Sequence, residues 1–282
     1  MLSQHLWSPD TPAAGLSGQL RVHLTRPRIS LPRRQSAFKP VASTRRDLLV
    51  GSCGNVCACT TRIKSGRWHW YDRYFAYSMA YGMQDYEEQI AGFKTGLFAD
   101  LFTCQIHSML EVGMGTGPNL KYLAAQKSVS IVGVDPNPEM APYAIEAASR
   151  AGLTRDQLQM LDGTAEQLPV ASQSQDAVIC TLVLCSVPNV ESALAEVKRV
   201  LKPGGKFLFI EHVLAPAPDR KLRLFQHILN PLQQATADSC HLDRDTLKSI
   251  QSAGFANVDA SSFVVPGLGL IGPHIAGIAT VK

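Results

Sequence analysis

Three closely spaced glycines, followed by a carboxylate at the end of the next apolar run, are the chemically most informative feature of this chain. Gly113, Gly115 and Gly117 follow one apolar segment, and Asp135 ends the next. Glycines let the backbone adopt positive φ and approach a ligand closely. The helix expected directly after them would present free N–H groups and partial positive charge. A carboxylate at the end of the second strand can accept hydrogen bonds from two ribose hydroxyls.

The glycine spacing is G-x-G-x-G, whereas dinucleotide-binding turns have G-x-G-x-x-G around a pyrophosphate. Glu111 stands two residues before the first glycine. An acidic side chain there would repel a pyrophosphate but suits a cationic ligand. S-adenosylmethionine has no phosphate, carries a sulfonium and has an amino group to satisfy. Glycines alone would also fit a turn that only packs tightly, but together with Glu111 and Asp135 they indicate an S-adenosylmethionine site.

Apolar runs and helical patterns alternate along the chain around this motif. Such alternation predicts a parallel sheet with helices on both faces, and ligands then bind at the carboxyl ends of the strands. The segment 216–242 breaks the rhythm. The predicted strands are 107–112, 130–134, 157–161, 176–181, 206–212, 258–265 and 274–281, and the predicted helices are 85–99, 118–126, 138–151, 190–201 and 243–253.

A single folded domain is predicted at 67–282, beginning with a helical cap at 67–104, and residues 1–66 are expected to lie outside it. Eight aromatic side chains gather between Trp68 and Tyr86. Several of them recur at helical spacing. We expect most of this stripe to pack in the core, although such a helix could also wall a substrate pocket.

The charge of the chain is unevenly distributed. The first 67 residues hold 11 Lys and Arg against two acids, whereas the other residues hold 16 basic and 21 acidic side chains. The body is therefore mildly acidic, which argues against nucleic-acid binding. The seven cysteines are an odd number at spacings that match no common zinc pattern. We therefore expect free thiols in a reducing compartment, and no metal. The sequence contains no run of 18 apolar residues, so no membrane span is predicted.

The N-terminal segment carries features of organellar targeting. Residues 1–43 are rich in Arg, Ser and Pro and resemble a transit peptide. Thr44–Gly51 contains Arg45-Arg46 and resembles a twin-arginine thylakoid signal, but its apolar region is short and a clean cleavage site is missing. We expect location in the chloroplast, in the stroma or at the thylakoid or plastoglobule surface. The thylakoid lumen and the cytoplasm are the alternatives, the latter with a disordered basic tail.

Residues from about 100 to 282 resemble the class I S-adenosylmethionine-dependent methyltransferases. Within that class, the run Cys-Thr-Leu-Val-Leu-Cys-Ser-Val at 180–187 resembles the thiol methyltransferase-like family, which has microsomal animal members. The resemblance implies an α/β, Rossmann-like fold: a three-layer sandwich around a seven-stranded, mostly parallel sheet. The chain departs at Met114, where a cysteine is common, and at its N-terminus, where the animal members carry a membrane-anchoring helix. The other stretches that carry the resemblance are 134–138, 199–205, 211–213 and 273–275.

The resemblance also implies a site for S-adenosyl-L-methionine as cofactor. Thr164 is expected on the adenine side of this site. Many relatives place an Asp where Thr164 stands, so Asp162 is an alternative to it. The family pattern assigns Glu111, Gly113 and Gly115, with Gly117 in the same turn, to the methionine end, Asp135 to the ribose, Pro136, Gly163, Thr164 and Ala165 to the adenine side, and Thr181 and Leu182 to the floor beneath the cofactor.

Methyl transfer is an in-line displacement, so the enzyme must align the nucleophile and keep it deprotonated. A thiol needs little help, because its unperturbed pKa is about 8.5 and the thiolate is the reactive form. Direct transfer needs no covalent intermediate, so we predict Cys185 and Cys240 to act as buried small apolar residues. Any of the candidate histidines could equally be structural. The candidate catalytic bases are His212, Asp238 and His274, with His241 also near the strand ends.

The sequence therefore predicts an S-adenosylmethionine-dependent methyltransferase for a small apolar acceptor, in the first place a thiol. An alternative is C- or O-methylation of a quinone or phenol, because 165–169 also resembles quinone-biosynthesis methyltransferases. A third hypothesis is a cofactor-binding, lipid-associated protein without turnover, since the aromatic segment 68–86 and the apolar segment 263–271 could form a sticky surface. The expected partner is a small molecule rather than nucleic acid, with peripheral contact to a membrane left open.

Overall fold

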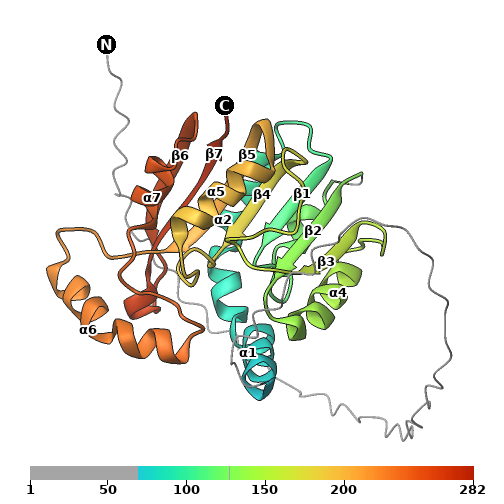
Figure 1. Ribbon diagram of the computed structural model, residues 1–282. Coiled ribbons are helices and arrows are strands. Elements are labelled where there is room, and N and C mark those ends of the chain that lie inside the picture. The colour runs from blue at the N-terminus through green and yellow to red at the C-terminus, as the bar shows by residue number, and fades with distance from the viewer. Residues whose placement is uncertain (1–68, 127) are drawn as a thin grey trace, which may run out of the picture. The chain divides into compact units, whose positions relative to one another are not determined.

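A seven-stranded sheet forms the centre of the structure (Figure 1), with the strand order β3-β2-β1-β4-β5-β7-β6. Strands β1 to β5 pair in parallel, and β7 runs antiparallel to both of its neighbours. The predicted mostly parallel, seven-stranded sheet is thus confirmed. The strands are β1 (Ser108–Val112), β2 (Ser130–Asp135), β3 (Leu158–Asp162), β4 (Gln175–Thr181), β5 (Leu201–His212), β6 (Asn257–Val264) and β7 (Pro273–Thr280).

The computed structural model describes residues 69–126 and 128–282, all of them within one compact unit. The predicted targeting segment 1–66 and its Arg45-Arg46 pair lie outside the described residues. None of the described helices combines the length and apolar character needed to cross a membrane. The helices are α1 (His69–Gly82), α2 (Gln84–Leu101), α3 (Leu120–Leu123), α4 (Ala141–Arg150), α5 (Val190–Val200), α6 (Arg220–Thr236) and α7 (Thr246–Ser252), with short 3₁₀ turns η1 (Pro138–Met140) and η2 (Gly269–Ile271).

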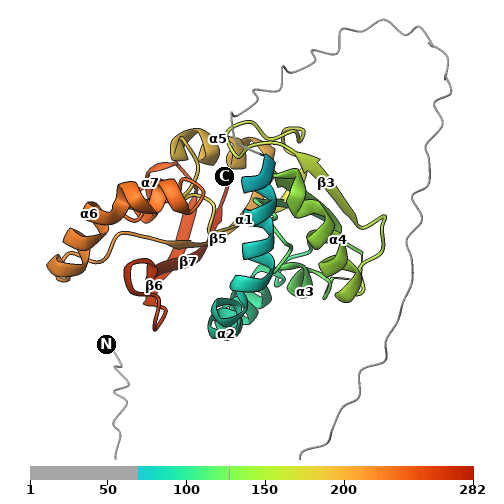
Figure 2. The same cartoon turned by 90° about the horizontal axis from the view of Figure 1, so that it is seen from below.

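Successive residues of each strand point to opposite faces of the sheet, and two separate apolar cores result. On one face, Met109 of β1 packs in a cluster with side chains of α2, α3 and α4, among them Phe98. On the other face, the next residue, Leu110, packs with Leu194 of α5 and Ile250 of α7. Figure 2 shows α2 and α3 on one side of the sheet and α5 and α7 on the other. The result is the predicted three-layer sandwich.

Helix α1 does not pack on either face but crosses the carboxyl ends of the strands, in front of the sheet in Figure 2. The side chain of Asn137 anchors it by donating to the carbonyl oxygen of Asp72 (2.9 Å). We expected most of its aromatic stripe in the core, and this was wrong, because only one side of a helix in this place meets the protein. The outward aromatic side chains, each 58–64% exposed, are Trp70, Tyr74, Tyr77 and Tyr81.

Two helices differ from the predictions in extent. The segment 216–242, expected to be irregular, contains α6, which begins where the Asp219 side chain accepts from the N–H of Leu222 (3.1 Å). Pro216 and Pro218 before the helix and Pro231 inside it concealed α6 in the sequence, because proline normally interrupts helical patterns. The predicted helix 118–126 is reduced to the single turn of α3.

Close backbone approach makes Gly277 of β7 sensitive to substitution. A Cβ at this residue would overlap the carbonyl oxygen of Asp259 and lie 2.8 Å from the Cα of Ala260 in β6. Gly277→Ala is expected to lower the free energy of unfolding by about 1–3 kcal/mol, as overpacking does. Urea unfolding followed by circular dichroism measures the loss. Gly96→Ala, at an exposed position of α2 where a Cβ meets nothing within 4 Å, is the control and should not destabilise the protein. Equal stability of both variants would contradict the β6–β7 contact.

Candidate active site

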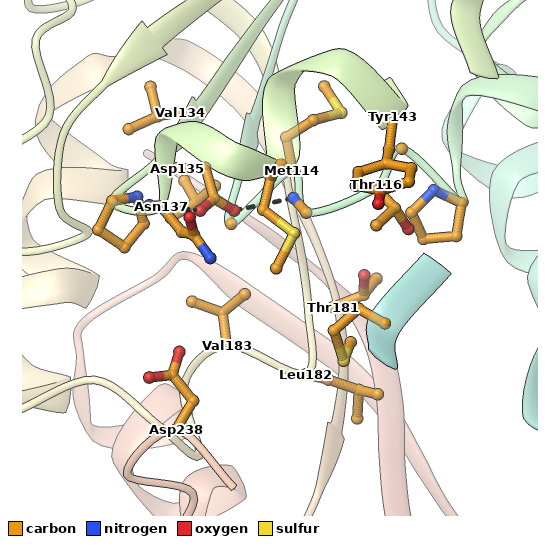
Figure 3. A pocket seen from close by; sticks show the side chains of 18 of the residues that line it. Met114, Thr116, Val134, Asp135, Asn137, Tyr143, Thr181, Leu182, Val183 and Asp238 are labelled. Atoms are coloured by element: carbon orange, nitrogen blue, oxygen red, sulfur yellow. Dashed lines mark hydrogen bonds between the residues drawn. The ribbon is translucent and has the colours of Figure 1, made fainter. Parts of the chain in front are cut away.

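A cavity of about 1370 Å³ lies at the carboxyl ends of β1, β2, β3 and β4, where the sequence placed the ligand site. Its walls come from the glycine turn after β1, the β2–η1 loop, the ends of β3 and β4, and helices α1 and α2. Figure 3 shows labelled residues of the glycine turn, of β2 and the loop after it, and of the end of β4 around this cavity. The described residues therefore include one large site at the edge of the sheet that α1 crosses.

The glycine turn is held in a conformation that only glycine adopts readily. Gly113, Gly115 and Gly117 have φ values of 64°, 55° and 77°. A Cβ at Gly113 would overlap the side chain of Val183, and one at Gly117 would lie 2.6 Å from Leu120 Cδ1. At Gly115, by contrast, the nearest protein atom would be 3.9 Å away. Two of the glycines therefore serve packing, whereas the third leaves its space open beside the cavity.

Asp135 ends β2 with its carboxylate against the glycine turn. One oxygen accepts from the N–H of Gly115 and the other from the N–H of Asn137, both at 2.8 Å, as the dashed lines in Figure 3 mark. Burial raises the pKa of Asp135 to about 6, while these two N–H groups act in the opposite direction. Each carboxylate oxygen can accept a second hydrogen bond. The side chain lines the cavity and can therefore hold a pair of hydroxyl groups there.

Glu111 lies beneath the turn and not among the residues that line the cavity, which differs from the expectation that it faces the ligand. One of its oxygens accepts from the Asn119 amide at 2.7 Å, and the same amide donates to the Thr181 hydroxyl at 3.0 Å. The other oxygen, and Oδ1 of Asn119, are buried without a hydrogen-bond partner. Burial raises the pKa of Glu111 to about 7. Asn119 was not among the predicted site residues, although it lies two positions after the last glycine, at the start of the helix.

The other residues assigned to the cofactor all lie at the cavity. Leu182 has a positive φ of 59°, a conformation that costs a non-glycine residue about 1–3 kcal/mol. In this conformation Leu182 directs the chain after β4 into the cavity wall. The residues concerned are Pro136, Gly163, Thr164, Ala165, Thr181 and Leu182, and the alternative Asp162 lines the cavity as well.

A buried ion pair that sequence analysis did not single out lies at the α2 side of the cavity. Nζ of Lys94 is 2.8 Å from each carboxylate oxygen of Glu87, and Lys94 is 1% exposed. Burial lowers the pKa of Lys94, and Glu87 raises it. The signal was the spacing: Tyr86, Ile90, Lys94 and Phe98 follow one another at intervals of four, which puts a lysine on the apolar face of the helix.

The two histidines proposed as bases lie behind the cavity wall rather than on it. His274 of β7 is engaged on both ring nitrogens, at 2.8 Å to the carbonyl oxygen of Gly272 and 3.1 Å to the hydroxyl of Tyr86. Burial lowers its pKa to about 4, so it is neutral near pH 7. His212, at the end of β5, contacts the Cys240 thiol at 2.8 Å. Neither ring is placed to take a proton from a molecule in the cavity.

Asp238 is the one predicted base that lines the cavity. Its φ is 49°, and in Figure 3 it lies on the far side of Val183 from Asp135. Electrostatic repulsion from the carboxylate of Asp238 contributes to the raised pKa of Asp135. None of the described residues that line the cavity is a histidine. The predicted burial of Cys185 and Cys240 is confirmed.

Residues 110–209 match the family model described as a methyltransferase domain. The chain is 34% identical over 220 residues to human thiol S-methyltransferase TMT1A, covering 76% of this chain and 89% of that protein. It is 33% identical over 170 residues to the ubiquinone/menaquinone biosynthesis C-methyltransferase UbiE of Nitrobacter hamburgensis, covering 54% and 66%. A crystal structure of an S-adenosylmethionine-dependent methyltransferase from Thermotoga maritima has a TM-score of 0.51 at 20% identity, covering 77% of this chain and 100% of that one, which supports the fold.

Proposed function

Because the chain belongs to the S-adenosylmethionine-dependent methyltransferase family that includes the thiol S-methyltransferases, we propose that its methyl acceptor is the sulfur of a small apolar thiol. One observation carries the choice of acceptor: the cavity wall has no histidine among the described residues. The acceptor must therefore reach its reactive form with little help. A thiol does so, because a few per cent is thiolate at neutral pH and the thiolate is strongly nucleophilic.

The set of hydrogen-bond acceptors around the glycine turn fits S-adenosylmethionine better than a phosphate-bearing cofactor. Asp135 presents carboxylate oxygens to the cavity, and the unpartnered oxygens of Glu111 and Asn119 beneath the turn are acceptors too. Such a set would repel a pyrophosphate, whereas it suits hydroxyl and ammonium groups. When bound, this cofactor supplies a methyl group on a positively charged sulfur. What remains for the protein is to hold the two reactants in line.

Individual residues take distinct parts in that alignment. We assign Asp135 to the ribose hydroxyls, since both of its oxygens are oriented by backbone N–H groups and face the cavity. We assign Lys94 to the carboxylate of the methionine moiety, because it is the buried cation of the α2 wall. Glu87 keeps that ammonium in place at 2.8 Å. Thr181 and Leu182 form the floor at the end of β4.

The remaining cavity wall suits an apolar acceptor. Apolar side chains from α1, from the junction between α1 and α2 and from the segment after β4 surround it. They would exclude water from a bound thiolate, which strengthens the electrostatic interactions around it. Asp238 adds a carboxylate at this end, so we expect neutral thiols to be preferred over anionic ones. The apolar residues concerned are Phe75, Met79, Met83, Val183 and Val187.

A quinone or phenol is the second candidate acceptor, favoured by the likeness of residues 165–169 to quinone-biosynthesis enzymes and by the UbiE relative. A phenol has an unperturbed pKa of about 10 and therefore needs a base. Among the described residues, Asp238 is the only predicted base that lines the cavity. It would therefore have to remove the proton from the phenol. The two candidates thus differ in their dependence on Asp238.

A panel of acceptors with labelled S-adenosylmethionine separates these candidates. The full-length protein should methylate a neutral alkyl thiol but neither a phenol nor a prenylquinol. The rate of thiol methylation should rise with pH and level off above the pKa of the acceptor itself. The bend in this pH–rate profile should move when an acceptor of different pKa is used. Asp238→Asn should leave thiol turnover within a few-fold of wild type. Turnover of the phenol alone, or a bend fixed at one pH for every acceptor, would overturn the proposal.

We also propose that the enzyme acts in the chloroplast, in the stroma or at a thylakoid or plastoglobule surface, as the composition of residues 1–43 suggests. The outward aromatic side chains of α1 support peripheral contact with a lipid surface. Exposed apolar side chains of α6 add to this: Leu224, Phe225, Ile228 and Leu232.

A further inference from the structure

Three side chains from distant parts of the sequence meet in the interior behind the acceptor wall of the cavity. Cys185 follows β4, His212 ends β5 and Cys240 lies in the loop after α6. One ligand atom from each lies within 4.8 Å of the other two, and all three residues are buried. No part of the methyl-transfer chemistry described above uses them. They form a compact set of two thiols and one imidazole, which we call the Cys-His-Cys cluster.

We propose that the Cys-His-Cys cluster binds one zinc ion. Two cysteine sulfurs and a histidine nitrogen are ligands that zinc takes in proteins, and soft thiolates disfavour magnesium and calcium. The charge balance also suits the interior. Two thiolates would be costly to bury alone, whereas two thiolates and one divalent cation are neutral together. Sequence spacing did not reveal the site, because its ligands come from three separate segments.

The geometry requires only a small adjustment to accept the ion. Zinc–nitrogen and zinc–sulfur bonds of about 2.1 and 2.3 Å at a tetrahedral angle separate the two ligand atoms by roughly 3.6 Å. Nε2 of His212 and Sγ of Cys240 are 2.8 Å apart, so Cys240 must move outward by a little under 1 Å. It lies in a loop rather than in a strand, and Gln233 donates to its sulfur at 3.5 Å. An amide donor to the sulfur is the kind of outer contact that orients a metal ligand.

The position of the cluster indicates what the ion does. Ser186 follows Cys185 and Ser239 precedes Cys240, and both serines line the cavity. An ion held behind them ties the segment after β4 to the loop after α6 and so fixes two parts of the acceptor wall. Three protein ligands are found among the described residues, which leaves a fourth position for water, as in open zinc sites. This inference does not depend on which acceptor the enzyme uses.

Metal analysis of the purified full-length protein tests the proposal. Protein expressed with added zinc and passed through a desalting column should retain zinc in a 1:1 ratio to chain, measured by plasma mass spectrometry. Cys240→Ser and His212→Ala should lose it. Cys104→Ser, which removes an exposed thiol outside the cluster, should retain it. A variant with serine at Cys53, Cys57 and Cys59 should also retain it, which separates the cluster from those thiols.

Cobalt substitution gives a readout that does not depend on the folding of a variant. Wild-type protein stripped with a chelator and loaded with Co²⁺ should show thiolate-to-cobalt charge-transfer absorption and the visible bands of tetrahedral cobalt. Added zinc should abolish both, and magnesium should not. Absence of stoichiometric metal in the wild type would overturn the proposal, as would a Cys185–Cys240 disulfide in protein purified under reducing conditions. Equal metal content in Cys240→Ser and Cys104→Ser would overturn it as well.

Discussion

Replacing Asp135 with alanine is expected to weaken S-adenosylmethionine binding roughly 10- to 150-fold. Losing a hydrogen-bonded charged acceptor costs about 1.5–3 kcal/mol, and each 1.4 kcal/mol is tenfold in Kd. Two effects add in this variant. The ribose loses its acceptor, and the N–H groups of Gly115 and Asn137 lose the oxygens that they bind at 2.8 Å. Titration calorimetry with the full-length protein measures the change.

Asp156→Ala is the matched control for this experiment, because it removes an equal charge at an exposed residue that does not line the cavity. Its affinity should equal that of the wild type. The wild type should also bind more weakly as pH falls through about 6, because the carboxyl of Asp135 then becomes protonated and loses acceptor capacity. Asp135→Ala should lack that dependence. Unchanged affinity in Asp135→Ala would refute the assignment of Asp135 to the ribose. Asp162, which also lines the cavity, would then be the next carboxylate to test.

The cofactor half of the site could be predicted from sequence because its parts are local. The glycine turn and Asp135 belong to one strand–turn–helix–strand unit, and neighbouring parallel strands bring their carboxyl ends together. The pairing of β1 with β2, in which Val112 lies beside Val134, puts the two motifs next to each other. Neither motif needs a distant contact to be recognised. Thr181 was assigned from the family resemblance, and the structure brings it to the same place because β4 pairs directly with β1.

The acceptor half could not be predicted in the same way, because it depends on which way side chains point at the end of the sheet. His212 and His274 were correctly placed at strand ends, and they are register partners between β5 and β7. The His212 ring is covered by Cys240 of the loop after α6, and the His274 ring by Tyr86 of α2 and Phe263 of β6. A strand end is therefore not equivalent to a cavity wall. Only Asp238, in a loop whose course the sequence left undefined, reaches the cavity.

Lys94 illustrates a different limit. Its place on the apolar face of α2 follows from helical spacing alone, but a lysine on such a face more often extends its ammonium to water. What keeps it buried is Glu87, which binds Nζ with both oxygens at 2.8 Å. Both residues stand on α2, seven positions apart, so the pair itself is local. Its burial depends on how α2 packs in the folded domain, which is a tertiary feature. The Cys-His-Cys cluster is the extreme case, since each of its residues comes from a different segment.

Within the glycine turn, two glycines are required for packing of the protein and one leaves room for the cofactor. Gly113 and Gly117 have no room for a Cβ, so their substitution would disturb the fold whatever the protein binds. Gly115 differs, because a Cβ there would meet no protein atom closer than 3.9 Å. A methyl group at this position therefore probes the ligand rather than the core. A matched position with positive φ is needed to subtract the backbone strain, and Gly152 provides it, with φ 81° and nothing within 4 Å of a Cβ.

Gly115→Ala is expected to weaken S-adenosylmethionine binding roughly 5- to 150-fold, because a methyl that intrudes on a close contact costs about 1–3 kcal/mol. Gly152→Ala should bind the cofactor as the wild type does, since Gly152 does not line the cavity. Both variants should lose similar stability, about 1–2 kcal/mol from the left-handed conformation, measured by thermal unfolding without ligand. Calorimetry with S-adenosylmethionine then isolates the binding effect. If Gly115→Ala binds as well as Gly152→Ala, the cofactor does not pack against this turn.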